Sequence, residues 1–299
     1  MKRSTIAAAA ADRVLVSDGG WGTYLQELGL IPGECPELWN LKHPERVLEV
    51  ASAYVAAGAD MIQTNSFGGS RCKLAMYDLA DQTAAINRAA AAISRQAAGQ
   101  SLWVVGSVGP TGKILLLGDT DEAQLSDAFR QQIEALAEGG ADAVCVETMS
   151  ALDEASLAIA TARRHSSLEV IATFTFAATK DENEYRTMMG VSPAEAARAA
   201  LEAGAHIIGS NCGNGFAGMI EIVRQMRREA GPGVPILVHG NAGLPRMENG
   251  REVFPETPAM MSAHLPALVE AGANIIGGCC GATPEHVRAI RQALQTMQR

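Results

Sequence analysis

Three cysteines occupy positions where their thiols could meet. Cys212 lies in the segment Gly-Ser-Asn-Cys-Gly, and the adjacent Cys279 and Cys280 lie in Gly-Gly-Cys-Cys-Gly. Each segment follows a short apolar run typical of a β-strand, and its glycines allow the backbone to turn a side chain into a cavity. Three thiolates on neighbouring strand ends are typical of a zinc site that leaves one coordination position for an incoming ligand.

Each of these cysteines, taken alone, also has a structural interpretation, because cysteine is among the most often buried residues. The adjacent pair favours the metal site. Consecutive side chains of a regular strand point to opposite faces, so both thiols reach one ion only where the strand ends and turns. Cys145 lies in an apolar run typical of a core, and Cys72 has no evident partner. Cys35 lies in a proline-flanked loop that could approach the site.

The chemistry expected of such a site involves sulfur. Zinc held by three thiolates carries negative charge, so it is poorly suited to making hydroxide and well suited to exchanging a soft ligand. An incoming thiol loses its proton on binding the ion, and the thiolate is the nucleophilic form of sulfur. The expected substrate is therefore a thiol that attacks an electrophilic carbon.

Two carboxylates end other predicted strands, Asp18 after the first and Glu147 after the fourth. They could act as general acid and base, bind a substrate ammonium group, or form structural salt bridges at the rim. Ammonium binding is favoured, because the thiol would already lose its proton on binding zinc. The strand ends also carry four positions that we assign to the substrate site, namely Gly19, Thr64, Asn65 and Asn211.

A four-residue signature recurs four times along the chain. It reads Ala-Gly-Ala or Gly-Gly-Ala followed by Asp, His or Asn. Each copy follows an alanine-rich helical stretch, and its glycine is expected to end that helix before an apolar strand. The copies are 57–60, 139–142, 203–206 and 271–274. Their spacings of 82, 64 and 68 residues each hold two strand–helix units.

Eight apolar runs separated by helical stretches predict a parallel (β/α)8 TIM barrel, forming a single domain over residues 1–299. An open doubly wound sheet is the rival, but no Gly-x-Gly-x-x-Gly follows the first strand to support it. The longest connections are expected at 20–39 and 240–258, covering the active site. The expected strands are 14–18, 61–65, 102–107, 143–147, 169–174, 207–212, 234–239 and 275–279.

Composition limits the possible functions. The 299 residues are 47% hydrophobic, enough for a large core. A net charge of −9 argues against nucleic acid as a partner. No apolar run reaches the roughly 18 residues of a membrane span. The alanine stretch after Met1-Lys2-Arg3 is interpreted as a frayed end of a cytoplasmic protein rather than a signal peptide.

Glycines at two strand ends support a different function. Loops after the seventh and eighth strands of such barrels often bind phosphate, and here they span 239–243 and 278–281. A phosphate-binding barrel enzyme would leave the adjacent cysteines without a role, so it ranks below the zinc interpretation. His239 is the only histidine at a strand end, and it could orient a ligand or hydrogen-bond inside the rim.

Seven segments in consistent order resemble the homocysteine S-methyltransferase family across nearly the whole chain. They are 18–23, 57–67, 106–112, 146–148, 209–212, 241–245 and 277–281. The resemblance implies a zinc-bearing barrel that methylates homocysteine to methionine, with no catalytic group beyond the zinc site. It implies that Asp18 and Glu147 hold the ammonium group of homocysteine, with the Gly19 backbone near its carboxylate. The zinc ligands it implies are Cys212, Cys279 and Cys280.

The family divides by methyl donor, which is betaine, S-methylmethionine, S-adenosylmethionine or a methylated corrinoid. Segments 109–112 and 241–245 most resemble the homocysteine module of cobalamin-dependent methionine synthase, which favours a corrinoid. The other modules of that enzyme are missing from this sequence, so the corrinoid is expected on a separate protein. Betaine enzymes have a tyrosine where this chain has Thr148, and this difference argues against betaine as the donor. The oligomeric state stays open, and a non-catalytic protein binding zinc or homocysteine is a further alternative.

Overall fold

The computed structural model describes residues 4–181, 183–248 and 251–297, so Met1, Lys2 and Arg3 lie outside the described residues. Eight parallel strands follow one another in chain order around a barrel, as the sequence predicts. Between the first strand and the second, the Asp60 amide donates to the Val16 carbonyl at 2.7 Å. The barrel strands are β1 (Leu15–Val16), β2 (Met61–Gln63), β3 (Trp103–Val108), β4 (Ala143–Met149), β5 (Glu169–Phe174), β8 (Ile207–Asn211), β9 (Ile236–Gly240) and β12 (Ile275–Gly278).

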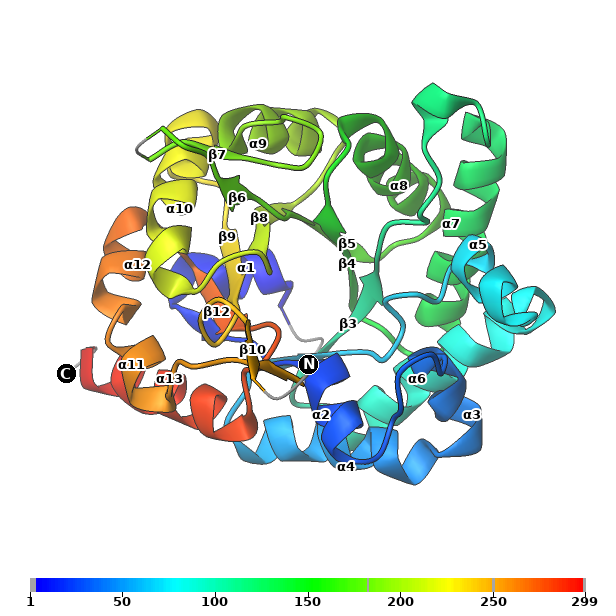
Figure 1. Cartoon of the computed structure of the whole chain (residues 1–299), viewed down its shortest axis with the longest axis horizontal. Coiled ribbons are helices and arrows are strands. Elements are labelled where there is room, and N and C mark those ends of the chain that lie inside the picture. Colours follow the sequence, from blue (N-terminus) through cyan, green and yellow to red (C-terminus); the bar gives the residue numbers. More distant parts are fainter. Residues whose placement is uncertain (1–3, 182, 249–250, 298–299) are drawn as a thin grey trace.

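Helices form a ring outside the strands (Figure 1). Their apolar faces pack against the outward-facing strand residues and make the larger hydrophobic core. The helices of the ring are α4 (Pro44–Ala56), α6 (Thr83–Ala98), α7 (Glu122–Glu138), α8 (Leu152–His165), α9 (Pro193–Glu202), α10 (Phe216–Ala230), α12 (Leu265–Ala271) and α13 (Pro284–Met297). Shorter helices in the connections are α2 (Trp21–Glu27), α3 (Trp39–Lys42), α5 (Arg71–Leu74) and α11 (Pro258–Ser262).

The four copies of the repeated signature turn at the amino ends of alternate strands, as predicted. Their glycines have φ between 95° and 109°, a left-handed conformation that glycine adopts without strain. Each turn ends one helix of the ring, and an arginine from the neighbouring helix before it in the ring packs on the turn. This arginine also pairs with the last residue of the signature. The four pairs are Arg291–Asp60, Arg95–Asp142, Arg163–His206 and Arg227–Asn274.

The barrel interior changes character from one end to the other. Its lower part is apolar and includes Leu15, Met61, Ile171, Ile207 and Ile275. Since side chains alternate along a strand, the inward positions nearer the carboxyl ends lie two or four residues later. Those positions are mostly polar, and they include Gln63, Ser107, Glu147, Thr173, Asn211, His239 and Cys279. The apolar layers support a polar floor beneath the mouth.

The amino end of the barrel is closed by a helix that the sequence interpretation missed. Residues expected to fray form α1 (Ile6–Asp12), and this helix lies within the ring of larger helices (Figure 1). Ile6 and Ala10 join the lower interior cluster. The amides of Ile6 and Ala7 donate to the Glu169 carboxylate at 2.6 and 2.8 Å. The expectation of a frayed end is therefore wrong from Ile6 onward, because long-range packing stabilises the alanine stretch.

The expected long connections are present but structured. The segment 20–39 contains α2, and 240–258 contains the antiparallel pair β10 (Arg246–Glu248) and β11 (Arg251–Val253). The connection after β5 is similarly long and forms the antiparallel pair β6 (Ala177–Ala178) and β7 (Tyr185–Arg186). Within the described ranges, no helix combines the length and apolar character needed to cross a membrane.

Candidate active site

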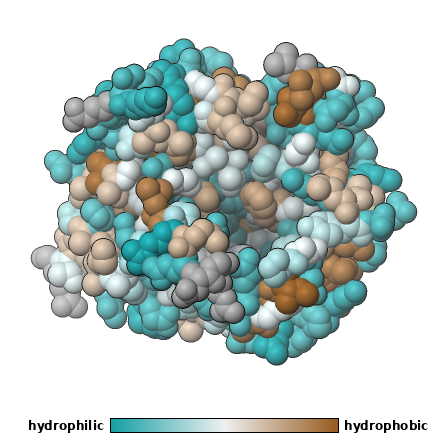
Figure 2. Space-filling model, viewed as in Figure 1, coloured by the Kyte–Doolittle hydropathy of each residue, from teal (hydrophilic) through white to brown (hydrophobic). Residues whose placement is uncertain are grey.

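A cavity of about 360 Å³ opens at the carboxyl ends of the barrel strands. Figure 2 shows this face hollowed near its centre, with hydrophobic and hydrophilic residues interspersed around the hollow. The cavity lining includes all three predicted zinc ligands and the carboxylates Glu37 and Glu147. No lysine, arginine or histidine occurs among the described residues that line it. The cavity is therefore suited to a cation or a positively charged group of a substrate.

The three predicted metal ligands converge on one side of the cavity. The sulfurs of Cys212, Cys279 and Cys280 lie within 4.8 Å of one another. The Cys280 sulfur is 4.0 Å from each of the other two. Two sulfurs bound to one zinc at about 2.3 Å with tetrahedral angles lie about 3.8 Å apart. The spacing of the thiols fits the zinc ion that the sequence predicts.

Adjacent residues face the cavity together at the ends of three strands. The pairs are Glu147 and Thr148 on β4, Asn211 and Cys212 at the end of β8, and Cys279 and Cys280 after β12. A regular strand would send the two members of each pair to opposite faces. Here the backbone leaves the regular path, with φ of 59° at both Thr148 and Cys212 and a register shift between Val146 and Met149. These turns double the number of side chains that each strand presents to the cavity.

When no cation lies between them, the three cysteine side chains change one another's pKa values through hydrogen bonds. Hydrogen bonds from Cys279 and Cys280 lower the pKa of Cys212. The same contacts with Cys212, together with burial, raise the pKa values of Cys279 and Cys280. One thiolate is thus stabilised by two protonated thiols. Removing all three protons requires a positive charge between the sulfurs, which a bound metal ion supplies.

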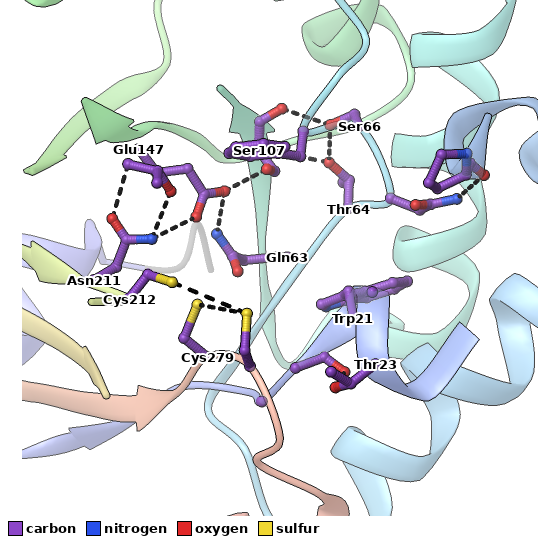
Figure 3. A pocket seen from close by; sticks show the side chains of 18 of the residues that line it. Trp21, Thr23, Gln63, Thr64, Ser66, Ser107, Glu147, Asn211, Cys212 and Cys279 are labelled. Carbon is purple, nitrogen blue, oxygen red and sulfur yellow. Dashed lines mark hydrogen bonds between the residues drawn. The ribbon is translucent and has the colours of Figure 1, made fainter. Parts of the chain in front are cut away.

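Glu147 lies opposite the sulfurs at the centre of a hydrogen-bond network (Figure 3). Its Oε1 accepts hydrogen bonds from Ser107 Oγ and from Gln63 Nε2, the latter at 2.9 Å. The Asn211 Nδ2 lies 3.5 Å from Oε2. Only 6% of Glu147 is exposed, and burial raises its pKa to about 7. A buried carboxylate held by neutral donors is prepared to bind an ammonium group.

Asp18 lies behind the cavity wall and is fully buried. Its Oδ2 accepts hydrogen bonds from Trp21 Nε1 at 2.7 Å and from the backbone N–H of Gln63 at 2.6 Å. Burial raises the pKa of Asp18 to about 6. Asp18 does not line the cavity itself, whereas Trp21 and Gln63 do. In this conformation Asp18 acts on the cavity by holding these two neighbours.

The other residues assigned to the substrate site are part of the cavity wall. Gly19, Thr64, Asn65 and Asn211 all line the cavity. Thr64 Oγ1 lies 2.6 Å from Ser66 Oγ and accepts from the Ser107 amide at 3.1 Å. Asn65 Nδ2 donates to the Pro36 carbonyl at 2.8 Å, which ties the connections after β1 and β2 together. Thr64 and Asn65 therefore have structural partners as well as a face on the cavity.

Several cavity residues were not assigned to the site from the sequence, among them Gln63, Ser107 and Glu37. Gln63 and Ser107 occupy inward positions of β2 and β3, so strand alternation could have identified them. Glu37 lies in a 3-10 turn, Pro36–Leu38, and no pattern pointed to it. Its Oε1 accepts from the Gly68 amide at 2.6 Å, and the Cys35 thiol lies 3.4 Å from its Oε2. Cys35 does not reach the cavity itself.

Two polar residues near the thiols have buried atoms without partners among the described residues. His239 Nε2 and Asn241 Oδ1 are both fully enclosed and accept or donate no hydrogen bond there. Burial lowers the pKa of His239 to about 4, so its ring is neutral at physiological pH. The Asn241 side chain also contributes to lowering the pKa of Cys212. His239 does not line the cavity. Cys145 is a core residue of the barrel interior, as the sequence predicts.

Two curated proteins similar to this chain in sequence are both named methionine synthase. The chain is 32% identical over 302 residues to methionine synthase of Mycobacterium tuberculosis and 33% identical over 298 residues to that of Mycobacterium leprae. These alignments cover 97% and 95% of this chain. They cover 25% and 24% of the two relatives, so the chain spans about a quarter of their length.

Solved structures share the same fold. The metallated form of the homocysteine methyltransferase MmuM from Escherichia coli superposes with a TM-score of 0.77 at 22% identity, covering 96% of this chain and 98% of MmuM. Its oxidised form gives a TM-score of 0.73 at 25% identity, with 93% and 95% coverage. The family model described as homocysteine S-methyltransferase matches residues 15–294. With its barrel, its three thiols and this match over nearly the whole chain, the protein belongs to the homocysteine S-methyltransferase family.

Proposed function

We propose that this protein transfers a methyl group to the thiol of homocysteine and releases methionine, using zinc held by Cys212, Cys279 and Cys280. The convergence of these three sulfurs at one side of an acidic cavity is the observation that carries the proposal. Family membership and the relatives named methionine synthase support it. When bound, zinc would hold the homocysteine sulfur as a thiolate.

The residues of the chain would orient homocysteine for this reaction. We assign the substrate ammonium group to Glu147, whose carboxylate faces the cavity without a basic partner among its described lining residues. Asp18 would support this site from behind Trp21 and Gln63. Gly19 would lie near the substrate carboxylate. No side chain is assigned as a general acid or base, because the reaction needs only the sulfur–carbon bond to form as the bond to the donor breaks.

Polar groups on the connection after β2 and at the end of β8 complete the proposed substrate site. Thr64, Asn65 and Asn211 line the same cavity as Glu147. They would shape the space between the ammonium site and the sulfurs. We also propose a cytoplasmic location, because a reducing compartment keeps three neighbouring thiols available for zinc.

We propose a methylated corrinoid, presented by a separate protein, as the methyl donor. The resemblance of segments 109–112 and 241–245 to the homocysteine module of cobalamin-dependent methionine synthase supports this donor, and the mycobacterial relatives are named methionine synthase. Exposed apolar side chains on the connections that surround the mouth suit contact with another protein. They include Phe67, Leu117, Met188, Leu244 and Met247, each more than two-fifths exposed.

A donor screen tests the proposed function. Zinc-loaded protein and homocysteine would be incubated separately with methylcobalamin, betaine, S-methylmethionine and S-adenosylmethionine, and methionine would be measured. Methionine formation from methylcobalamin is expected, and it should disappear in Cys280→Ser together with most of the bound zinc. Formation only with another donor would exclude the corrinoid.

The same screen separates the alternative functions. A protein that binds zinc and homocysteine but forms no methionine with any of these donors or with a protein-bound methylated corrinoid would be a non-catalytic binding component. A wild-type protein that binds no zinc would refute the proposed mechanism. The phosphate-binding alternative is disfavoured by the cavity, because its described lining has two carboxylates and no basic side chain to offset the charge of a phosphate.

A further inference from the structure

We propose that Thr148 and Asn211 are positioning residues that connect the Glu147 carboxylate to the metal ligand Cys212. The inference rests on the proposed function, since it concerns how the ammonium site and the zinc site are held relative to each other. It assigns to Asn211, in addition to its place in the cavity lining, a role exerted through its neighbours.

Thr148 and Asn211 form a reciprocal pair of hydrogen bonds. The Thr148 amide donates to Asn211 Oδ1 at 2.8 Å, and Asn211 Nδ2 donates to Thr148 Oγ1 at 2.7 Å. Asn211 Oδ1 also accepts from Thr173 Oγ1 at 2.7 Å, and its Nδ2 lies 3.5 Å from Glu147 Oε2. Only 1% of Asn211 is exposed. The amide uses its hydrogen-bonding capacity on protein groups (Figure 3).

The backbone at both ends of this link is strained. Thr148 and Cys212 each have φ of 59°, and a β-branched residue in the left-handed region is a genuine outlier. Such conformations are unfavourable and persist only where surrounding contacts determine them. The reciprocal bonds to Asn211 supply those contacts at Thr148. Asn211 is also the residue immediately before Cys212, so its orientation sets the start of the turn that carries the ligand.

The link crosses three neighbouring strands of the barrel. Thr148 lies on β4, Thr173 on β5 and Asn211 on β8, and these strands are adjacent in the order β8-β5-β4. A shift of the Asn211 amide would displace Cys212 along the chain and Thr148 through the hydrogen bonds. Because Glu147 precedes Thr148, the same shift would move the carboxylate. The distance between the ammonium site and the sulfurs is thus maintained by one amide group.

Zinc affinity, measured by competition with a chelator and without any methyl donor, tests the proposal. Thr148→Val keeps the shape of the side chain but removes the oxygen that accepts from Asn211. We expect zinc affinity to fall about tenfold, as is typical when a group supporting a metal ligand is lost. Thr148→Ser keeps the hydroxyl and should stay within about twofold of wild type. The cobalt-substituted protein should show a shifted thiolate-to-metal absorption band in Thr148→Val only.

Thr161→Val is the matched control, because Thr161 is a buried threonine of the outer helix α8 whose hydroxyl lies 3.0 Å from Ser126 Oγ. It should leave zinc affinity unchanged. Thr148→Ala removes the same hydroxyl with less strain and should match Thr148→Val if that variant folds poorly. Unchanged zinc affinity in Thr148→Val or Thr148→Ala would overturn the proposal, as would an equal loss in Thr148→Ser. A wild type without zinc would instead refute the proposed function.

Discussion

Burial determines the chemistry of individual residues in this cavity. Glu147 is held by Ser107 and Gln63, two neutral donors, and its exposed fraction is 6%. Asp18 is enclosed still more completely. Both carboxylates therefore have raised pKa values, and each would be stabilised as an anion by a positive group entering the cavity. The amino acid ammonium proposed as the ligand is such a group.

Glu147→Gln is expected to weaken homocysteine binding while zinc stays bound. The substitution keeps the size of the side chain and removes the charge, so a charge-assisted hydrogen bond to the substrate is lost, which corresponds to about a tenfold or greater rise in Kd. Calorimetric titration with homocysteine, together with metal analysis, would measure both quantities.

Glu154→Gln is the control for this experiment. Glu154 is a similarly buried carboxylate that accepts from the Thr111 amide and hydroxyl, and it does not line the cavity. It should not change homocysteine affinity. If Glu147→Gln bound homocysteine as tightly as wild type, Glu147 would have to be removed from the ammonium site.

The pH dependence of stability follows from the same burial. Burial raises the pKa of Glu147 from its ordinary value of 4.5 to about 7 in the folded protein. Folding therefore favours the protonated form of Glu147. The stabilising contribution of Glu147 to the free energy of unfolding is fully present below pH 4.5. It is lost as pH rises from about 4.5 to 7, because the unfolded chain then binds fewer protons than the folded one. Asp18 acts in the same direction between 3.8 and about 6.

Urea unfolding of the zinc-free and homocysteine-free protein would measure this effect. The free energy of unfolding should decrease by up to about 3 kcal/mol across that pH range through Glu147. Glu147→Gln should show a flatter profile, since glutamine resembles the protonated acid. Parallel profiles for wild type and variant would mean that Glu147 does not titrate as its burial indicates.

At the scale of the elements, the two ends of each strand have different tasks. Irregular backbone at the carboxyl ends of β4 and β8, and the turn that follows β12, bring adjacent side chains into the cavity. Regular glycine turns at the amino ends anchor the helices through arginine contacts. In a barrel of this kind, function gathers at the first end and stability at the second. The repeated signature belongs to the second group, although it is the most conspicuous pattern in the sequence.

Arg227→Ala should destabilise the fold without altering the site. The guanidinium of Arg227, on α10, donates four hydrogen bonds, to the Gly231, Val234 and Gly272 carbonyls and to Asn274 Oδ1. Losing them should reduce the free energy of unfolding by roughly 2–4 kcal/mol. Denaturant unfolding would measure the change, and zinc affinity should be unaffected.

Arg224→Ala is the matched control on the same helix. Arg224 is 48% exposed and lies 3.7 Å from Glu221, so its loss should cost less than about 0.5 kcal/mol. Equal effects of the two substitutions would show that the contacts at the glycine turn contribute nothing special.

At the scale of the whole molecule, the barrel presents one hollowed face with apolar side chains on several connections around it (Figure 2). These side chains come from segments far apart in the sequence, which the closed barrel places around one opening. A small donor would need only the cavity. A corrinoid carried on a protein would also need the surrounding surface, so substitutions there distinguish the two kinds of donor.

The double substitution Leu244→Asp and Met247→Asp tests this surface. These residues are 62% and 67% exposed, so the fold should tolerate the change. Methionine formation from a protein-bound methylated corrinoid should fall about tenfold, a typical loss when apolar contacts at an interface are replaced by charge. Turnover with free methylcobalamin should not change.

Met297→Asp provides the control, because Met297 is 43% exposed at the end of α13, away from the mouth. It should affect neither reaction. An equal loss with free and protein-bound donor would place the effect in the cavity rather than in docking.

The local patterns of the sequence were sufficient for much of the fold. All eight barrel strands lie within the ranges predicted from apolar runs, apart from one or two residues at their ends. The four glycine turns have the left-handed backbone that the repeated signature predicts. Periodicity and glycine encode these features locally. The alanine stretch of α1 was misjudged, because its stability comes from Glu169 and the barrel interior rather than from its own sequence.

The sequence by itself determined which residues end the strands, and therefore that Cys212, Cys279 and Cys280 would share one end of a barrel with Glu147. Only the tertiary structure decided how deep each side chain lies. It places Asp18 behind Trp21, brings Glu37 to the cavity wall, and turns Asn211 toward Thr148. These outcomes depend on contacts between segments distant in the chain, and no local pattern records such contacts.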